Sequence, residues 1–347
     1  MGGVLVAMSG GVDSTMAASL LMAQGYSCQG LTLKLFQQGD LEPPGIKDAR
    51  EAASALGIPH HVYDCREEFS RRVIGPFMEI YEGGATPNPC VTCNRCIKFE
   101  TLLKKARDLG LDRVATGHYA RIEEDPQTGR FLLKKAADPL KDQSYVLYTL
   151  SQEQLRHCLF PLGGLKKNEV REKAALRGLA NAQKEESQDI CFIPQGRYGD
   201  FIQARRGQRS PEGDFIDPSG KLLGRHRGII WYTIGQRRGL HISLNKPMYV
   251  KSKNRADNTV TLCEDQDLYG STLEAGDFNW IPFDSPGEPI RVKAKIRYNQ
   301  AEVWALATEI PGGRVRLDFE EPQRAISPGQ AAVLYQDDMI LGGGTIL

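Results

Sequence analysis

The stretch VLVAMSGGVDS, residues 4–14, places five apolar residues directly before a glycine-rich turn, and a segment with helical spacing follows it. Gly10 and Gly11 let the backbone turn sharply and approach a ligand closely, and Ser9 and Ser14 add hydroxyl groups. A helix that begins after such a turn directs free N–H groups and the positive end of its dipole at an anion. The stretch therefore predicts a strand, a turn and a helix that bind the phosphates of a nucleotide.

The turn differs from two widespread phosphate-binding loops. No Lys follows the glycines, as a GxxxxGK[ST] loop requires, and the GxGxxG spacing of dinucleotide-binding folds is absent. A purely structural turn is the alternative, because Asp13 and Ser14 are common helix-capping residues. The position directly after an N-terminal strand favours the binding function.

Composition indicates a soluble globular protein of two or three domains. The chain has 347 residues, of which 41% are hydrophobic and 25% charged, and this length exceeds that of one typical domain. No apolar run approaches the roughly 18 residues that a membrane helix needs. The N-terminus begins a strand directly and lacks the features of a signal peptide, so we expect a cytoplasmic protein. Its eight cysteines are then expected to be thiols, catalytic groups or metal ligands rather than disulfides.

The first half of the chain alternates strand and helix patterns with short connections. Such repeated units predict a parallel sheet covered by helices on both faces, a doubly wound α/β fold. Ligands of these sheets bind at the carboxyl ends of the strands. Ser9 and the segment Gly117-His118-Tyr119 both follow predicted strands, so they can lie at one edge. The expected strands are 4–8, 27–36, 61–64 and 113–116, and the expected helices are 15–24, 47–56, 98–109 and 166–178.

The pattern changes from about residue 205 onward. Glycines and prolines first punctuate short segments, and turn signals then separate strand-like segments, which is typical of a small antiparallel barrel. We expect an α/β domain over 1–200, a small central domain over 201–270 and a C-terminal antiparallel β-barrel over 271–347. The expected barrel strands include 290–296, 303–307, 314–319 and 331–335.

Positive charge gathers in the centre of the chain, although the net charge is only +1. Residues 197–251 hold four acidic and eleven basic residues. This excess can contact a polyphosphate backbone, and a solvated basic face is the alternative. The basic residues are Arg197, Arg205, Arg206, Arg209, Lys221, Arg225, Arg227, Arg237, Arg238, Lys246 and Lys251.

A cysteine-rich segment, TPNPCVTCNRC at residues 86–96, is the second informative stretch. Its prolines predict an extended loop, with a helix beginning near Cys96. Cys93 would then lie just before a helix N-terminus, where the dipole lowers the pKa of a thiol and favours the nucleophilic thiolate. Cys191, within SQDICFI at 187–193, is a second candidate. The two thiols can act as a pair only if the fold brings them together.

Several motifs, in this order, resemble those of the bacterial tRNA-specific 2-thiouridylases, which are PP-loop ATP pyrophosphatases. The resemblance spans almost the whole chain and implies an N-terminal PP-loop domain. The motifs are SGGVDS at 9–14, NPCVTCN at 88–94, TGHY at 116–119, KDQSY at 141–145, DICF at 189–192, TIGQRRG at 233–239 and the pair Arg297-Tyr298.

The resemblance implies that sulfur replaces an oxygen on the wobble uridine of tRNA. ATP would adenylate the C2 oxygen and release pyrophosphate, which turns a poor leaving group into a good one. A persulfide on Cys191 would attack C2 and expel AMP. Cys93 would then break the remaining sulfur–sulfur bond by thiol–disulfide exchange, leaving a Cys93–Cys191 disulfide. The implied requirements are ATP, Mg²⁺, tRNA and a sulfur-donor protein, either a cysteine desulfurase or a sulfur-relay protein, acting with a monomeric enzyme.

Further roles carry over only to positions that match the family's motifs. Asp13 would help to place Mg²⁺. Some of these residues also have a purely structural alternative: Leu33 can be a core residue, His118 a buried histidine with internal partners, and Arg297 and Tyr298 a pair at the barrel rim. The positions matched to ATP binding are Ala7, Met8, Ser9, Gly10, Gly11, Val12, Asp13, Ser14, Leu33 and Gly117. The positions matched to tRNA recognition are Asn88, Pro89, Cys90, His118, Lys141, Asp142, Gln143, Arg297, Tyr298 and Gln330.

One position departs from the family pattern. Cys90 stands where the family commonly has an Asp, its proposed general acid/base, so the proton-transfer role is unassigned. Cys90, Cys93 and Cys191 can alternatively hold a [4Fe–4S] cluster with one open iron site, whereas a zinc site lacks a second CxxC pair. We favour the persulfide route. The remaining cysteines outside this segment are expected to be structural thiols: Cys28, Cys65, Cys158 and Cys263.

Two other functions would keep part of this pattern. A PP-loop ligase that forms amide bonds on a small molecule needs neither the cysteine pair nor the basic second half. A non-catalytic RNA-binding protein does not depend on the loop at 9–14.

Overall fold

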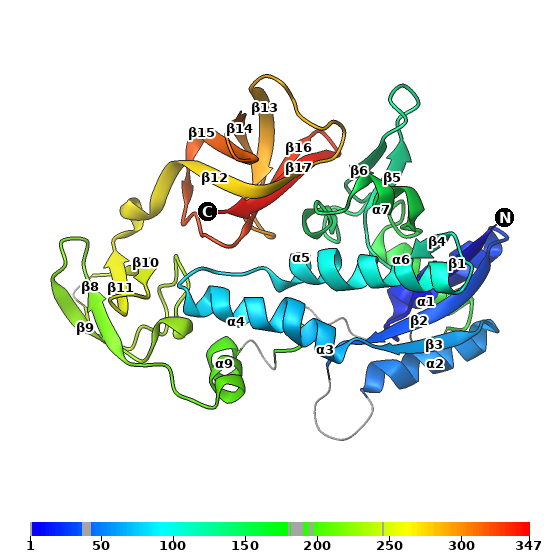
Figure 1. Ribbon diagram of the computed structural model, residues 1–347, viewed down its shortest axis with the longest axis horizontal. Coiled ribbons are helices and arrows are strands. Elements are labelled where there is room, and N and C mark those ends of the chain that lie inside the picture. Colours follow the sequence, from blue (N-terminus) through cyan, green and yellow to red (C-terminus); the bar gives the residue numbers. More distant parts are fainter. Residues whose placement is uncertain (1, 37–42, 180, 182–189, 194–196, 245) are drawn as a thin grey trace.

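The N-terminal part is built on a five-stranded sheet with the strand order β3-β2-β1-β4-β7. The computed structural model describes residues 2–36, 43–179, 181, 190–193, 197–244 and 246–347, and Figure 1 shows its arrangement. All pairings in this sheet are parallel, and β1 lies between β2 and β4. The strands are β1 Gly3–Ala7, β2 Ser27–Lys34, β3 His60–Asp64, β4 Arg113–Ala115 and β7 Cys158–Leu159.

Helices cover both faces of this sheet because alternate residues of β1 point to opposite sides. Val4 packs with Ala18 and Ala49 from two helices on one face, whereas Leu5 packs with Phe99 on the other. This arrangement confirms the doubly wound α/β fold. The helices of this part are α1 Val12–Ala23, α2 Pro44–Leu56, α6 Phe99–Asp108, α7 Gln152–His157 and α8 Lys167–Leu176, with a 3₁₀ turn at Ser144–Val146.

Two long helical rods run beside each other from the sheet toward the other domains (Figure 1). Each rod contains one π-helical turn. Ile97 of the second rod shares a buried cluster with Phe69 and Phe77 of the first, so apolar packing holds the rods together. The first rod is α3 Arg66–Phe69, the π turn Ser70–Ile74 and α4 Gly75–Glu82; the second is α5 Pro89–Cys93, the π turn Asn94–Lys98 and α6.

A small four-stranded sheet of order β10-β11-β8-β9 follows in the middle of the sequence and lies at the end of the molecule opposite the parallel sheet (Figure 1). Phe215, Val260 and Leu262 from this sheet are buried in the same cluster as the helical rods. The elements here are α9 Tyr198–Arg206, β8 Gly213–Ile216, β9 Leu222–His226, β10 Tyr249–Asn254 and β11 Thr259–Cys263, with 3₁₀ turns at Ile229–Trp231 and Asp265–Leu268.

The C-terminal part is an antiparallel barrel, as expected, and the pairing of β12 with β17 closes it. The four strands expected from the sequence are present, but the two strands that close the barrel, β12 and β17, were not predicted. The strands are β12 Tyr269–Trp280, β13 Ile290–Lys295, β14 Val303–Ile310, β15 Arg314–Arg324, β16 Ala331–Gln336 and β17 Met339–Ile346.

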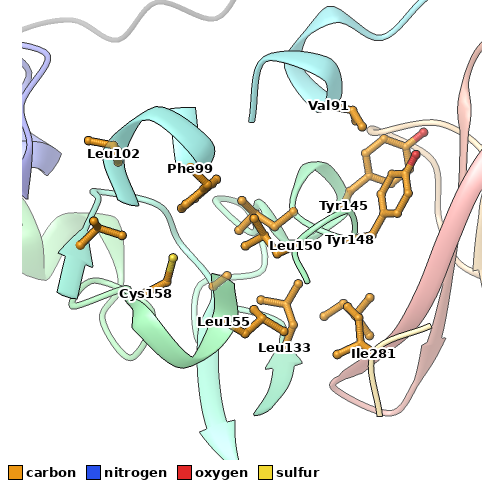
Figure 2. Close-up of a cluster of buried hydrophobic side chains, with 14 of the residues drawn as sticks. Val91, Phe99, Leu102, Leu133, Tyr145, Tyr148, Leu150, Leu155, Cys158 and Ile281 are labelled. Atoms are coloured by element: carbon orange, nitrogen blue, oxygen red, sulfur yellow. The ribbon is translucent and has the colours of Figure 1, made fainter. Parts of the chain in front are cut away.

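A hairpin from the first half, β5 Arg121–Glu124 and β6 Phe131–Lys134, extends the barrel sheet. Lys134 pairs with Met339 of β17, and the Arg121 guanidinium lies 2.6 Å from the Asp338 carboxylate. Figure 2 shows the apolar core beneath the hairpin, to which Ile281 contributes from the end of the barrel sheet. The first half and the barrel therefore share one core.

None of the described helices is both long and apolar enough to cross a membrane.

The turn before α8 generates a stability prediction. A Cβ on Gly163 would lie 1.9 Å from the carbonyl oxygen of Ala120, so Gly163→Ala forces the backbone apart. We expect this change to lower the free energy of unfolding by about 2 kcal/mol or more, measured by urea denaturation followed by circular dichroism.

The neighbouring glycine provides the control. A Cβ on Gly164 meets nothing within 4 Å, so Gly164→Ala should leave stability unchanged or raise it by a few tenths of a kcal/mol. Equal effects of the two changes would contradict the packing argument.

Candidate active site

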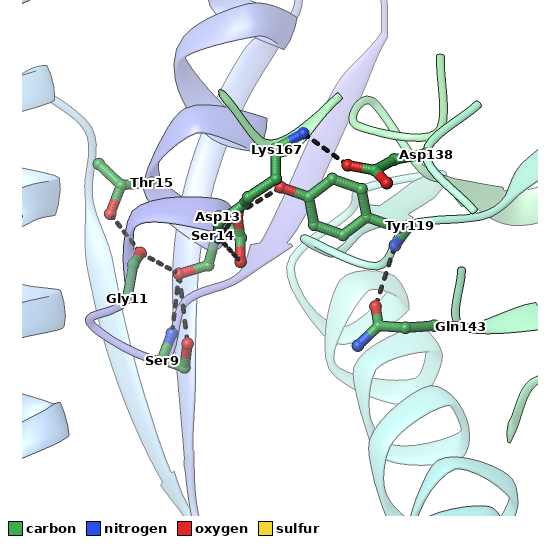
Figure 3. Close-up of polar contacts among 9 residues, drawn as sticks. All are labelled: Ser9, Gly11, Asp13, Ser14, Thr15, Tyr119, Asp138, Gln143 and Lys167. Atoms are coloured by element: carbon green, nitrogen blue, oxygen red, sulfur yellow. Dashed lines mark hydrogen bonds and ion pairs between the residues drawn. The ribbon is translucent and has the colours of Figure 1, made fainter. Parts of the chain in front are cut away.

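Hydroxyl groups tie the loop after β1 into a tight turn (Figure 3). The backbone N–H of Ser9 donates to Ser14 Oγ at 3.2 Å. The hydroxyls of Ser14 and Thr15 both donate to the carbonyl of Gly11, each at 3.1 Å. These bonds fix the loop at the carboxyl end of β1 before any ligand arrives.

The two glycines of this loop have different tasks. Gly10 has φ +76°, and a Cβ there would lie 2.7 Å from the carbonyl oxygen of Gly45, so a side chain is excluded. Gly11 is the N-cap of α1. Because no side chain of the N-cap accepts a hydrogen bond, the first N–H groups of the helix keep their capacity to donate. The helix starts at Val12, three residues earlier than predicted. Its N-terminus therefore offers donors and a positive dipole to an anion.

Asp13 is held by Tyr119 of the TGHY motif and by Lys167, which the sequence did not single out. Its carboxylate accepts hydrogen bonds from Lys167 Nζ at 2.7 and 2.8 Å and from the Tyr119 hydroxyl at 2.7 Å (Figure 3). The Lys167 side chain is only 10% exposed, and its backbone N–H donates to Asp138. A lysine this deeply buried requires a charged partner, so Asp13 and Lys167 form a fixed pair beside the loop.

The loop after β4 meets the loop after β1 at the backbone. A Cβ on Gly117 would lie 2.8 Å from the carbonyl carbon of Asp13 and from the nitrogen of Ser14, so only glycine allows this approach. The N–H of Tyr119 donates to Gln143 Oε1 at 3.0 Å. The strand pattern placed these two loops at one edge of the sheet, and the structure brings them into contact.

A cleft of about 560 Å³ opens at this edge. It joins the turn at residues 9–14 to the end of β2, to the second loop and to Cys191, so the glycine-rich turn and a thiol share one cavity. Lys98 and Thr32 also line it. The predicted site residues that line the cleft are Ala7, Met8, Ser9, Asp13, Ser14, Leu33, Gly117, His118, Gln143 and Cys191.

The prediction that Cys93 precedes a helix was wrong. Asn88 caps α5 by accepting a bond from the N–H of Val91 at 3.4 Å, and α5 runs from Pro89 to Cys93. The π turn and α6 continue without a break. Cys93 therefore lies inside a helical rod, and the positive end of the dipole is near Asn88 instead. Proline is common at the first helical position, so Pro89 begins a helix here and does not extend the loop.

The expected low pKa of Cys93 was also wrong. Burial raises the pKa of the Cys93 and Cys90 thiols, and the Lys98 ammonium opposes this rise at both. Cys191 is exposed as a residue, yet protein crowds its thiol. This desolvation, together with the neighbouring Cys93 and Cys90, raises the pKa of Cys191 to about 12. The three thiols are thus close enough to influence one another, although Cys93 does not line the cleft.

The cysteines do not form a ready metal site. In the part of the chain that the structure describes, no three His, Cys, Asp or Glu side chains are arranged to hold a metal ion. Cys90, Cys93 and Cys191 therefore do not fit a preassembled iron–sulfur cluster. The other cysteines at Cys28, Cys65, Cys158 and Cys263 are buried.

The barrel residues matched to tRNA recognition, Arg297, Tyr298 and Gln330, are not among the residues that line the cleft. Arg297 donates to the carbonyl of Ala325 at 2.6 Å and to Ser327 Oγ at 3.0 Å. Gln330 Nε2 donates to the Thr86 carbonyl at 3.0 Å, ahead of α5. These two side chains hold the barrel together and attach it to the α5 rod, whereas Tyr298 is 41% exposed.

Other matched residues also have internal partners. The Asp142 carboxylate accepts bonds from the N–H of Ala136 at 3.0 Å and from the Ser144 hydroxyl at 2.7 Å, and the Asp142 carbonyl accepts from Tyr298 at 3.2 Å. Lys141 belongs to the same turn, and its backbone N–H donates to the Asp138 carbonyl. Their roles toward a bound RNA stay predictions.

The basic segment is partly neutralised within the protein. Arg206 pairs with Glu82 and Arg225 with Asp214, both at 2.8 Å. The remaining excess includes the exposed pair Arg237 and Arg238, as well as Arg227 and Lys221. That this segment contacts a polyphosphate stays a prediction, and such a contact would use the basic residues without an acidic partner in the segment.

Family models match three consecutive parts of the chain. They are the tRNA methyl transferase HUP domain over residues 2–195, the tRNA methyl transferase PRC-barrel domain over 199–264 and the aminomethyltransferase β-barrel domain over 270–346. Each follows one of the structural parts described above.

Curated relatives match over nearly the whole length. The chain is 46% identical to the tRNA-specific 2-thiouridylase MnmA of Acetivibrio thermocellus, with 99% of this chain and 98% of that protein covered. The enzyme of the same name from Clostridioides difficile is 46% identical over 99% and 97%. That of Moorella thermoacetica is 49% identical over 99% and 98%. The chain therefore belongs to the tRNA-specific 2-thiouridylase family.

Proposed function

We propose that the protein is an ATP-dependent sulfurtransferase that converts the wobble uridine of tRNA into 2-thiouridine. Its relatives carry the name tRNA-specific 2-thiouridylase. The observation that carries the proposal is the cleft that holds both the phosphate-binding turn and Cys191. Activation by ATP and attack by sulfur occur at the same carbon, so their groups must share one cavity.

The first step is adenylation of the uridine. The C2 oxygen attacks the α-phosphorus of ATP, the bond to the β-phosphate breaks, and pyrophosphate leaves. The loop at 9–14 and the N-terminus of α1 would hold the phosphates through backbone N–H groups. Leu33 and Gly117 line the same cleft and would contact the nucleoside of ATP.

Mg²⁺ fits the donor chemistry of this site. Mg²⁺ prefers oxygen ligands and is usually held by one or two carboxylates together with substrate phosphates. The Asp13 carboxylate lines the cleft, and Lys167 and Tyr119 fix its position. Bound Mg²⁺ would offset the negative charge of the phosphates.

The second step transfers sulfur. The terminal sulfur of a persulfide on Cys191 attacks C2, the C–O bond breaks, and AMP leaves. The thiolate of Cys93 then attacks Cys191 Sγ, which breaks the bond to the transferred sulfur and releases 2-thiouridine. A Cys93–Cys191 disulfide remains, and a dithiol must donate two electrons to reduce it. The electrostatic influence of Cys93 on Cys191 supports this pairing.

The proposed partners are tRNA and a sulfur-donor protein, a cysteine desulfurase or a sulfur-relay protein that loads Cys191. A monomer in the cytoplasm is the proposed working state. A small-molecule ligase would not use the thiols beside the cleft. A non-catalytic RNA-binding protein would not use the hydrogen-bonded turn at residues 9–14.

Nucleoside mass spectrometry tests the proposed function. Unmodified tRNA incubated with the protein, ATP and a persulfide source should gain 2-thiouridine at the wobble position, and protein purified anaerobically should do so without stoichiometric iron. Activity that rises in proportion to bound iron would overturn the persulfide route. Pyrophosphate release that requires a small acid instead of tRNA would overturn the substrate assignment.

Replacing the two thiols should stop the reaction at different stages. Cys191→Ser cannot carry the persulfide, so 2-thiouridine should fall about 100-fold or more. Cys93→Ser should accumulate RNA joined to Cys191 by a disulfide when no reductant is added, detected as an RNA–protein band on a denaturing gel. Cys96→Ser, in the same helical rod, should retain activity within about twofold. An equal loss in all three variants would contradict the assignment.

The contact between the two loops predicts an effect on ATP binding. Gly117→Ala pushes on the backbone of Asp13 and Ser14, so calorimetry should show an increase in the Kd for ATP of about tenfold or more. Gly164→Ala, with open space around it, should leave the Kd unchanged. Unchanged binding in Gly117→Ala would show that this loop does not hold ATP.

A further inference from the structure

Lys98 is a cation in the cleft to which neither the motifs nor the proposed steps assign a role. It ends the π turn that follows Cys93 and lines the cleft together with Ser9, Gln143 and Cys191. π turns within α-helices occur often at functional sites. Here the turn sets where Lys98 lies relative to Cys93, because both belong to one continuous rod.

A buried histidine holds this lysine. Lys98 Nζ lies 3.5 Å from His118 Nε2, and His118 Nδ1 lies 2.7 Å from Thr116 Oγ1. An ammonium can only donate, so Nε2 accepts and Nδ1 carries the proton and donates to Thr116. Burial, with the nearby Lys98 charge, lowers the pKa of His118 well below its usual value. His118 is therefore a neutral acceptor of fixed tautomer.

Packing fixes the ring of His118 as well. Its centroid lies 5.7 Å from that of Phe99 and 5.9 Å from that of Phe160, and the residue is only 8% exposed. The two phenyl rings also contact each other, with centroids 6.0 Å apart, so the three rings form one aromatic cluster that packs the His118 ring. Lys98 is the partner of its Nε2 atom, so His118 can hold the lysine, and its role in tRNA recognition stays a prediction.

The groups around Lys98 show where its charge acts. The Lys98 charge lowers the pKa of all three thiols, Cys90, Cys93 and Cys191, against the effect of burial. The other charged groups lining the cleft are Asp13, which is paired with Lys167, and Lys34. The positive charge of Lys98 therefore favours ionisation of the three thiols to thiolates.

We infer that Lys98 is a catalytic residue that stabilises anionic sulfur at Cys93 and Cys191 during sulfur transfer, and that His118 positions it. The inference rests on the proposed function. Lys98 neither gives nor takes a proton in this role. Its positive charge lowers the energy of the attacking thiolate and, on Cys191, of the persulfide anion. Because position 90 is a neutral thiol, no carboxylate there offsets this charge.

Alkylation of the full-length protein by iodoacetamide tests the inference without RNA or ATP. Peptide mapping by mass spectrometry would give the rate for Cys93 from pH 6 to 11. In Lys98→Met the rate at pH 8 should fall about tenfold, and the midpoint of the profile should move up by about one pH unit. Lys104→Met, an exposed lysine on α6, should leave the profile unchanged. An unmoved profile in Lys98→Met overturns the inference.

Three further variants separate charge from structure. Lys98→Arg should keep the wild-type profile, since it keeps the charge. Cys90→Asp should slow alkylation of Cys93, because a carboxylate offsets Lys98. His118→Leu should move the profile in the same direction as Lys98→Met, whereas a merely structural histidine would leave it unmoved. Circular dichroism identifies a variant that fails to fold. If Lys98→Met or His118→Leu does so, the test rests on the alkylation profiles of Cys90→Asp and Lys98→Arg.

The two proposals fail in different ways. Absence of 2-thiouridine from reactions of the wild-type protein would overturn the proposed function, whatever the alkylation profile shows. A normal yield of 2-thiouridine with an unmoved profile in Lys98→Met would overturn only the role of Lys98.

Discussion

The whole site depends on one close approach between backbones. Gly117 lies so near the peptide between Asp13 and Ser14 that a single added methyl group would collide with it. Because β1 and β4 are neighbours in the sheet, their loops emerge side by side, and the missing side chain lets them touch. Tyr119 can then reach Asp13, and His118 comes to line the same cleft.

The position of Cys93 depends on a second constraint, the continuity of the α5–α6 rod. The rod begins where the barrel grips the chain: the N–H of Thr86 donates to the Pro328 carbonyl at 2.8 Å, and Gln330 donates to the Thr86 carbonyl. From there, one continuous helix carries Cys93 and then Lys98 toward the sheet. The barrel thus fixes the start of the rod that carries Cys90 and Cys93. The sheet fixes the loop at residues 9–14.

The sequence was sufficient for the α/β architecture, because the period of apolar residues and the terminating glycines mark the strands and helices of the first half. It missed β17 because Gly342, Gly343 and Gly344 have low strand propensity. They are required since a Cβ at Gly343 would lie 2.8 Å from the Tyr148 ring. Lys98 and Lys167 were missed because facing a cleft depends on tertiary packing, which no local motif records. Residues 182–189, which include part of the motif around Cys191, lie outside the described residues.

The shared core beneath the β5–β6 hairpin bears on the order in which the molecule can be completed. Leu133 and Tyr145 share a buried cluster with Tyr335 and Ile340 of the barrel, which are synthesised later. Until then this apolar surface has no cover, and the first half has no complete interior of its own. The core of the first half is therefore complete only when the barrel strands pack against it.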